Sequence, residues 1–249
     1  MNIVRICFVF FIFALSACDQ INQNDGQAGT QGENGNFKLL SNTNNFKISN
    51  YNEARAVFWK YVYPSSAKTL YCNEVFNSKE RSGFNIEHVF PMSWATNGLS
   101  CGTRKQCRNN SPTFNKIEAD LHNLYPSRSD VNEKRSSFRF GLIRGEERHF
   151  GQACDFEFDS RRRIVEPAES VRGDVARAMF YMASQYKQHG LVLFKNQVVL
   201  LRGWHQSDPP TNAEKSRNAL IEQIQGNRNP FIDEPDKLIE LIEQGHFKN

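Results

Sequence analysis

The sequence lacks a hydrophobic run long enough to cross a lipid bilayer. Its longest apolar segment, residues 6–15, is shorter than the about 20 residues that a membrane-spanning helix needs. Arg5 precedes this segment and Leu15-Ser16-Ala17-Cys18 follows it, an order typical of an export signal. We therefore expect residues 1–18 to be a signal peptide and the chain to be exported, to the periplasm or to the medium.

The end of this signal also resembles a bacterial lipobox, in which the cysteine becomes the lipidated first residue of the mature protein. Cys18 would then anchor the chain to a membrane. Ordinary signal cleavage, with Cys18 incidental, is the alternative interpretation.

Apolar side chains are also scarce from residue 19 to residue 36, where Asn, Gln and Gly predominate. A segment of this composition cannot bury enough apolar surface to fold. We expect residues 19–36 to be a flexible tether, followed by one folded domain over residues 37–249.

Cysteines are few, and two of the six lie in the signal. The remaining four, Cys72, Cys101, Cys107 and Cys154, are an even number in an exported chain, which favours disulfides. Three pairings are possible, and we favour Cys101–Cys107 with Cys72–Cys154. A zinc site is the competing interpretation, but the C-x-x-C and His-x-x-x-His spacings are absent around Cys101 and Cys107.

One short motif carries most of the chemistry. In Gly83-Phe84-Asn85-Ile86-Glu87-His88-Val89-Phe90-Pro91, apolar and polar residues alternate, which predicts a strand. Glu87 could hold a hard cation, and a neutral His88 could take a proton from water. Neighbours on a regular strand point to opposite faces, so both residues could serve one site only where the strand ends or twists. A half-buried strand with a structural histidine is the alternative.

A second alternating stretch, Glu118–Pro126, predicts another strand, reached by a long loop. After it, Asp130 and Glu133 have the spacing of a capping box, so a helix should start near Ser129 or Asp130. Asn132 would lie in its first turn. This order could bring Glu87, His88 and Asn132 together.

These motifs resemble the endonuclease I family. The resemblance is carried by Glu87-His88-Val89-x-Pro91, Asp120-Leu121-His122-Asn123-Leu124 and Val131-Asn132-x-x-Arg135-Ser136, and it runs from about Phe46 to Phe231. It implies a bacterial periplasmic or secreted non-specific nuclease with a ββα-metal (His-Me finger) site. The sequence departs from the family's pattern at Glu133-Lys134, which replaces the usual Gly-Asp.

The resemblance and the residue chemistry assign roles to five positions. Glu87 and Asn132 would bind Mg²⁺, with Ca²⁺ or Mn²⁺ as alternatives. His88 would be the general base, held by Glu118, and Arg104 would clamp the phosphate. Asp120 is our second choice of partner for His88, and we expect a structural role for His122. The resemblance further implies DNA and RNA as substrates and 5′-phosphate product ends.

The rest of the sequence predicts a mainly helical α+β domain, which we expect to be a monomer. Helical spacing or C-terminal glycines predict helices over Val171–Gln188, Ala213–Gln225 and Asp236–Gln244. Three aromatic residues are expected in the core rather than in base stacking: Phe180, Tyr181 and Trp204.

A large excess of positive charge is also missing. The formal charge of +4 falls to +3 once Arg5 is removed with the signal. A net charge this small is weak support for nucleic-acid binding. The distribution of the charged side chains matters more than their sum. The cluster Arg104-Lys105-x-x-Arg108 adjoins the predicted site, whereas Arg161–Arg163 should be solvated. Two other functions remain open: a metal-dependent phosphodiesterase for small molecules, and a non-catalytic nucleic-acid-binding lipoprotein.

Overall fold

The computed structural model describes residues 46, 48–145 and 147–247, all of which belong to one compact unit. The predicted signal peptide, the Cys18 lipidation site and the predicted tether lie outside the described residues. None of the helices in the described part of the chain is long and apolar enough to cross a membrane.

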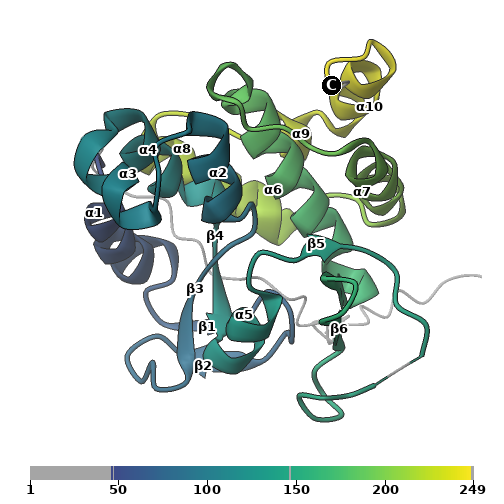
Figure 1. Ribbon diagram of the computed structural model, residues 1–249. Helices are drawn as coiled ribbons and strands as arrows, with labels where there is room; N and C mark the ends of the chain where they lie inside the picture. The colour runs from purple at the N-terminus through teal and green to yellow at the C-terminus, as the bar shows by residue number, and fades with distance from the viewer. Residues whose placement is uncertain (1–45, 47, 146, 248–249) are drawn as a thin grey trace, which may run out of the picture. The chain divides into compact units, whose positions relative to one another are not determined.

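Helices predominate in the described residues, which also contain three small sheets, and most of the helices lie to one side of the strands (Figure 1). The α-helices are α1 (Tyr51–Val57), α2 (Met92–Leu99), α3 (Arg104–Asn110), α4 (Pro112–Glu118), α5 (Ser129–Arg135), α6 (Arg172–Gln185), α7 (Lys195–Ser207), α8 (Asn212–Gln225), α9 (Pro230–Asp233) and α10 (Pro235–Glu243). A π-helical turn, η1 (Phe58–Val62), extends α1, and the 3₁₀ turns are η2 (Leu121–Asn123), η3 (Glu169–Val171) and η4 (Lys187–His189). The predicted α+β class is confirmed.

The strands form two antiparallel pairs and one mixed sheet. Their bounds are β1 (Ser66–Lys68), β2 (Val75–Asn77), β3 (Phe84–His88), β4 (Leu124–Arg128), β5 (Arg139–Phe140), β6 (Phe156–Asp159) and β7 (Ile164–Pro167). β1 pairs with β2 and β3 with β4, while β7 lies between β5 and β6.

The pair β3–β4 and the helix α5 that directly follows it position the predicted site. β3 confirms the predicted strand, and His88 is its last residue, paired with Leu124 of β4. The second predicted strand was placed wrongly, because Glu118 ends α4 and the strand begins only at Leu124. Pro126 lies inside β4, which is tolerated because β4 is an edge strand of a two-stranded sheet.

The segment between β3 and β4 is helical rather than a long loop. It contains α2, α3 and α4, which are close neighbours in Figure 1 and are in contact with one another. Ser111 caps α4 and Pro112 opens it, which is the favourable position for a proline in a helix. Ser111 and Pro112 thus start a helix that continues to Glu118, although the alternating pattern around Glu118 favours a strand.

The core is built largely around α6, which confirms the helix predicted there. Phe180 and Tyr181 on α6 and Trp204 on α7 are buried, as expected for core residues. α8 ends at Gly226, whose φ of +88° is the left-handed conformation favoured by glycine at a helix C-terminus.

Both predicted disulfides are present. Cys72 is bonded to Cys154 and Cys101 to Cys107, so these four thiols are not available as zinc ligands. The short bridge joins helix α3, which contains both Cys107 and Arg104, to the turn before it.

Candidate functional site

A pocket of about 790 Å³ lies where the end of β3 meets α3 and α5. Among the residues that line it are Glu87, His88, Arg104, Arg108 and Asn132. The expected meeting of Glu87, His88 and Asn132 therefore occurs. Glu87 and His88 reach one pocket because they lie at the end of β3, as a site on two adjacent strand residues requires.

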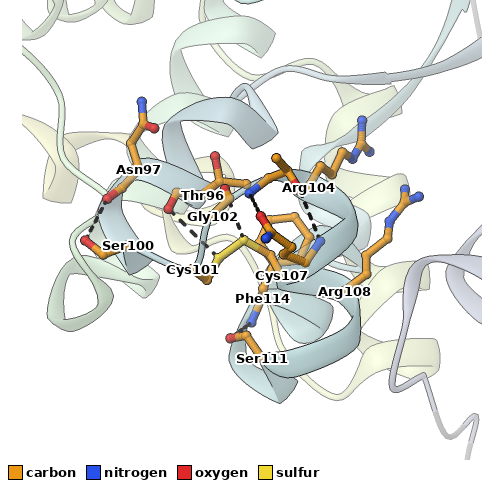
Figure 2. The surroundings of a disulfide bond; sticks show 12 residues. Thr96, Asn97, Ser100, Cys101, Gly102, Arg104, Cys107, Arg108, Ser111 and Phe114 are labelled. Atoms are coloured by element: carbon orange, nitrogen blue, oxygen red, sulfur yellow. Dashed lines mark hydrogen bonds between the residues drawn. A yellow bond between two sulfur atoms is a disulfide. The ribbon is translucent and has the colours of Figure 1, made fainter.

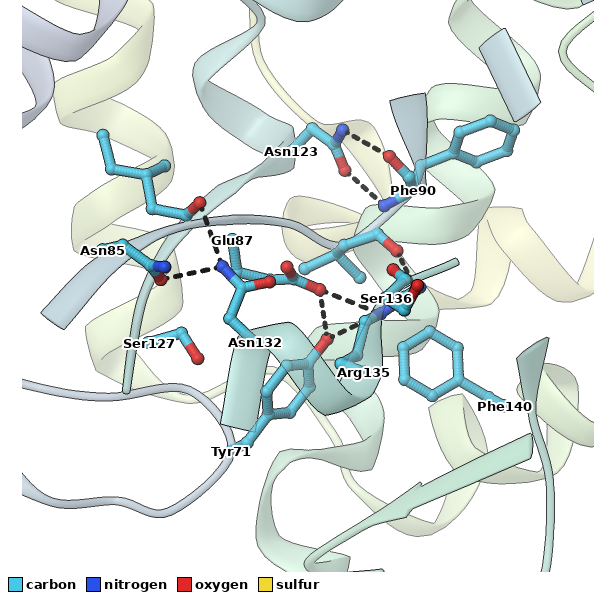
Figure 3. Close-up of polar contacts among 12 residues, drawn as sticks. Tyr71, Asn85, Glu87, Phe90, Asn123, Ser127, Asn132, Arg135, Ser136 and Phe140 are labelled. Carbon is cyan, nitrogen blue, oxygen red and sulfur yellow. Dashed lines mark hydrogen bonds and ion pairs between the residues drawn. The ribbon is translucent and has the colours of Figure 1, made fainter. Parts of the chain in front are cut away.

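Glu87 is held by one of its two carboxylate oxygens. Its Oε1 accepts a hydrogen bond from Tyr71 Oη at 2.7 Å and lies 2.9 Å from Nε of Arg135, a fully buried cation (Figure 3). Glu87 also lines the pocket. Burial raises the pKa of Glu87 to about 7, although Arg135 and Tyr71 act to lower it.

The amide of Asn132 is oriented by its nitrogen. Nδ2 donates to Asn85 Oδ1 at 2.8 Å and to the backbone carbonyl of Ile86 at 3.2 Å. The amide oxygen is thus directed away from Asn85 and Ile86, and Figure 3 shows it pointing toward the Glu87 carboxylate. The predicted start of α5 is confirmed, but its capping box is not formed, because the Asp130 carboxylate pairs with Arg128.

The pair Glu87 and Asn132 suits a hard divalent cation. One carboxylate oxygen and one amide oxygen face each other, and Mg²⁺ commonly uses one or two protein oxygens together with water and substrate phosphate. No group of three or more His, Cys, Asp or Glu side chains that could hold a metal occurs in the described ranges.

His88 is held by the backbone rather than by a carboxylate. Its Nε2 lies 3.0 Å from the backbone carbonyl of Glu118. Since a carbonyl oxygen can only accept, Nε2 carries the proton and Nδ1 keeps its lone pair. Burial and the positive charge of Arg104 lower the pKa of His88 to about 4, so the ring is neutral near pH 7.

The expectation that a carboxylate holds His88 was wrong, because the partner is the main chain of Glu118. The Glu118 carboxylate is fully buried and is bound by Arg104 through Nε and by Arg108 through Nε at 2.7 Å and Nη2 at 2.8 Å. Burial raises its pKa, but the two arginines outweigh burial and hold the pKa of Glu118 below its usual value. Glu118 thus supports His88 by its main chain and anchors the arginines by its side chain.

Arg104 and Arg108 lie one turn apart on α3. Thr103 and Gln106 form a capping box that starts this helix, and the Cys101–Cys107 bridge ties it to the preceding turn. Figure 2 shows both guanidinium groups on the same side of α3, directed away from the disulfide. Arg104 keeps its two terminal nitrogens free of hydrogen bonds to other described residues, so they could receive a phosphate.

His122 and Asp120 do not belong to the pocket. His122 is buried and its Nε2 lies 3.0 Å from the carbonyl of Asn227, which fits the expected structural role. The Asp120 carboxylate accepts hydrogen bonds from Tyr181, Tyr186 and other groups, so it is not available to His88.

Sequence reasoning missed four residues of the site. Tyr71 and Arg135 orient Glu87, Arg108 neutralises Glu118, and the ring of Tyr51 lies 5.1 Å from that of His88. The basic cluster containing Arg108 was a usable signal, because Arg104 and Arg108 are four residues apart on one helix. Tyr71 and Tyr51 gave no local signal.

Comparisons with known proteins show which family the chain belongs to. The sequence model of the family described as Endonuclease I matches residues 14–236. An extracellular deoxyribonuclease of Aeromonas hydrophila is 40% identical over 63% of this chain and 67% of its own length. A periplasmic deoxyribonuclease of the same organism is 39% identical over 69% and 81%, respectively. An extracellular ribonuclease of Bacillus amyloliquefaciens is 27% identical over 85% and 73%.

The family match extends over most of the chain and includes every residue of the pocket. The resemblance seen in the sequence motifs is therefore confirmed: the chain belongs to the endonuclease I family of nucleases.

Proposed function

We propose that this chain is an exported endonuclease that hydrolyses phosphodiester bonds of DNA and RNA, with one divalent cation, Mg²⁺, and with His88 as general base. The observation that carries the proposal is the state of His88. Its ring is neutral near pH 7, its Nε2 donates to the Glu118 carbonyl, and its Nδ1 therefore carries the lone pair that can accept a proton. The relatives named deoxyribonucleases and ribonuclease support nucleic acid as the substrate.

Each side chain in the pocket has a separate task. Glu87 and Asn132 hold the cation, which neutralises phosphate charge when bound. His88 accepts a proton from the attacking water through Nδ1, which is worth roughly 10²–10⁴ in rate. The planar guanidinium of Arg104 donates to two phosphate oxygens, and Arg108 holds Glu118 in place.

Recognition of the backbone explains a lack of sequence preference. The groups assigned here bind phosphate or water, and phosphate contacts carry little sequence information. The products would carry 5′-phosphate ends, as the family resemblance implies.

A supercoiled-plasmid assay tests the proposal. With Mg²⁺, the purified chain should nick plasmid DNA and degrade RNA, EDTA should stop both reactions, and excess Mg²⁺ should restore them. Binding without cleavage would support the non-catalytic lipoprotein instead. Turnover of small phosphodiesters that is insensitive to salt would support the small-molecule enzyme, because polymer binding weakens steeply as salt rises.

The membrane anchor is a separate part of the proposal. Leu15-Ser16-Ala17-Cys18 would be processed so that lipidated Cys18 begins the mature, monomeric enzyme. Intact mass of membrane-extracted protein should show Cys18 at the N-terminus with added acyl mass. A different N-terminus without acyl mass would leave an exported enzyme without an anchor.

A further inference from the structure

A second hollow, of about 480 Å³, lies beside the first turns of the domain and has no role in the proposed mechanism. It is lined by residues of α1, of η1 and of the segment between β2 and β3: Asn52, Arg55, Ala56, Trp59, Lys60 and Arg81. We call it the Trp59 groove.

The Trp59 groove carries positive charge without a compensating carboxylate. Arg55, Lys60 and Arg81 are exposed, and the lining residues include no Asp or Glu. Over the described ranges, none of these three cations is in an ion pair; Arg81 donates one hydrogen bond to the carbonyl of Ser78. Their charge is therefore available to an anionic ligand.

An aromatic ring lies among these cations. Trp59 is half-buried, and the ring of Phe76 meets it edge-on at 6.0 Å between centroids. The Arg81 guanidinium lies 5.1 Å from the Trp59 centroid. Aromatic rings and guanidinium planes are the surfaces on which unpaired bases stack.

Local backbone geometry presents this ring. Trp59 and Lys60 belong to η1, where α1 continues as a π-helical turn. Such turns are rare and concentrate at functional sites, because they change the direction of the side chains that follow.

The Trp59 groove is also close to the catalytic pocket. Tyr51 lines the pocket, and Asn52, the next residue on α1, lines the groove. Tyr51 and Trp59 are eight positions apart along α1 and η1, a rise of about 12 Å at helical spacing.

We propose that the Trp59 groove is a second nucleic-acid subsite, which binds a single-stranded segment a few nucleotides from the cleaved bond. This inference rests on the proposed function. Arg55 and Lys60 bind phosphates, and a base stacks on the platform of Trp59 and Arg81. Single strands are favoured because a duplex keeps its bases stacked on one another.

Binding of a 20-nucleotide single-stranded oligodeoxynucleotide and of a duplex of the same length, both in EDTA, tests the subsite without cleavage. Trp59→Ala should weaken single-strand binding about tenfold, within the range measured for base stacking on aromatic residues, and should leave duplex binding within about twofold. The single strand should also quench tryptophan fluorescence in the wild type and quench it much less in Trp59→Phe.

The cations are tested by a matched pair of double variants at exposed positions. Arg55→Gln with Lys60→Gln should reduce the salt dependence of single-strand binding by about 1.4 in log–log slope, at about 0.7 per phosphate contact. Arg161→Gln with Arg162→Gln removes the same charge elsewhere and should change the slope little. Thermal unfolding checks that all variants are folded.

The outcomes separate the subsite from the proposed function. If the wild type cleaves plasmid but Trp59→Ala and the Arg55/Lys60 variant bind single strands normally, the subsite is wrong and the nuclease stands. Equal losses on single strand and duplex would overturn the preference for single strands. A wild type that binds but does not cleave would contradict the proposed function.

Discussion

Nε2 of His88 lies 3.0 Å from the backbone carbonyl of Glu118, and this contact determines which nitrogen of the imidazole can act. The carbonyl accepts the Nε2 proton, so Nδ1 is the basic nitrogen. A backbone partner does not titrate, unlike a carboxylate. Burial and the charges of Arg104 and Arg108 outweigh the raising effect of Glu118, so the pKa of His88 is lowered to about 4.

Asn132→Ala should weaken Mg²⁺ binding without unfolding the protein. The substitution removes the amide oxygen that faces Glu87, at a side chain that is only half-buried. Removal of a group that only supports a metal ligand lowers metal affinity by roughly 10–100-fold. Since Asn132 would be a ligand itself, we expect its loss to lower Mg²⁺ affinity by at least that factor. Isothermal titration with Mg²⁺ measures the loss of affinity. Wild-type cleavage by Asn132→Ala at limiting Mg²⁺ would refute this assignment.

Arg135→Met should lower the free energy of unfolding much more than the same substitution at an exposed arginine. Arg135 is fully buried, and Glu87 would remain as a buried carboxylate without its cation. Breaking such a pair costs about 3–5 kcal/mol, and urea unfolding measures the change. Arg161→Met, on the exposed cluster, should stay within about 0.5 kcal/mol. Equal unfolding midpoints for the two variants would contradict the role of Arg135.

Mg²⁺ affinity should fall as the pH drops below neutrality. Burial raises the pKa of Glu87 to about 7, so below that pH a proton occupies the carboxylate that must bind the cation. Affinity should decline toward tenfold per pH unit below about 7, because each bound ion displaces one proton. At saturating Mg²⁺, activity should persist to lower pH, until His88 is protonated near its pKa of about 4. An activation constant for Mg²⁺ that is unchanged between pH 5.5 and 7.5 would rule this out.

Loss of the two disulfides should have unequal effects. The Cys72–Cys154 bridge spans 82 residues and the Cys101–Cys107 bridge only 6. The chain-entropy relation gives about 4–5 and about 2 kcal/mol, respectively. Double Cys→Ser variants, compared by urea unfolding, should follow this order. Loss of the Cys101–Cys107 bridge should lower activity per folded molecule more than loss of the Cys72–Cys154 bridge, because the short bridge fixes the helix that carries Arg104 and Arg108. Equal activity losses in the two double variants would contradict this role.

The sequence predicted the parts of the site that depend on local pattern. Alternation predicted the strand that ends at His88, and the even number of exported cysteines favoured disulfides. The spacing of Asp130 and Glu133 predicted the start of α5, although the capping box itself does not form. The strand and the helix start depend on residues that are close together in the chain, and the presence of disulfides follows from the number of cysteines.

Contacts between distant segments could not be predicted in the same way. The alternation around Glu118 predicted a strand, but Ser111 and Pro112 start a helix that ends at Glu118. This places the Glu118 carbonyl, and not its carboxylate, against His88. Tyr71 reaches Glu87 from 16 positions earlier in the chain, and no periodicity encodes such a contact.

The rate of plasmid cleavage by His88→Ala tests the central claim most directly. The variant should lose about 10²–10⁴ in turnover, the usual value of general-base catalysis, while it still binds Mg²⁺ by titration and DNA by gel shift. His149→Ala, at an exposed histidine, should cleave like the wild type. A folded His88→Ala protein with near-normal turnover would contradict the mechanism proposed here and leave His88 as a structural residue of β3.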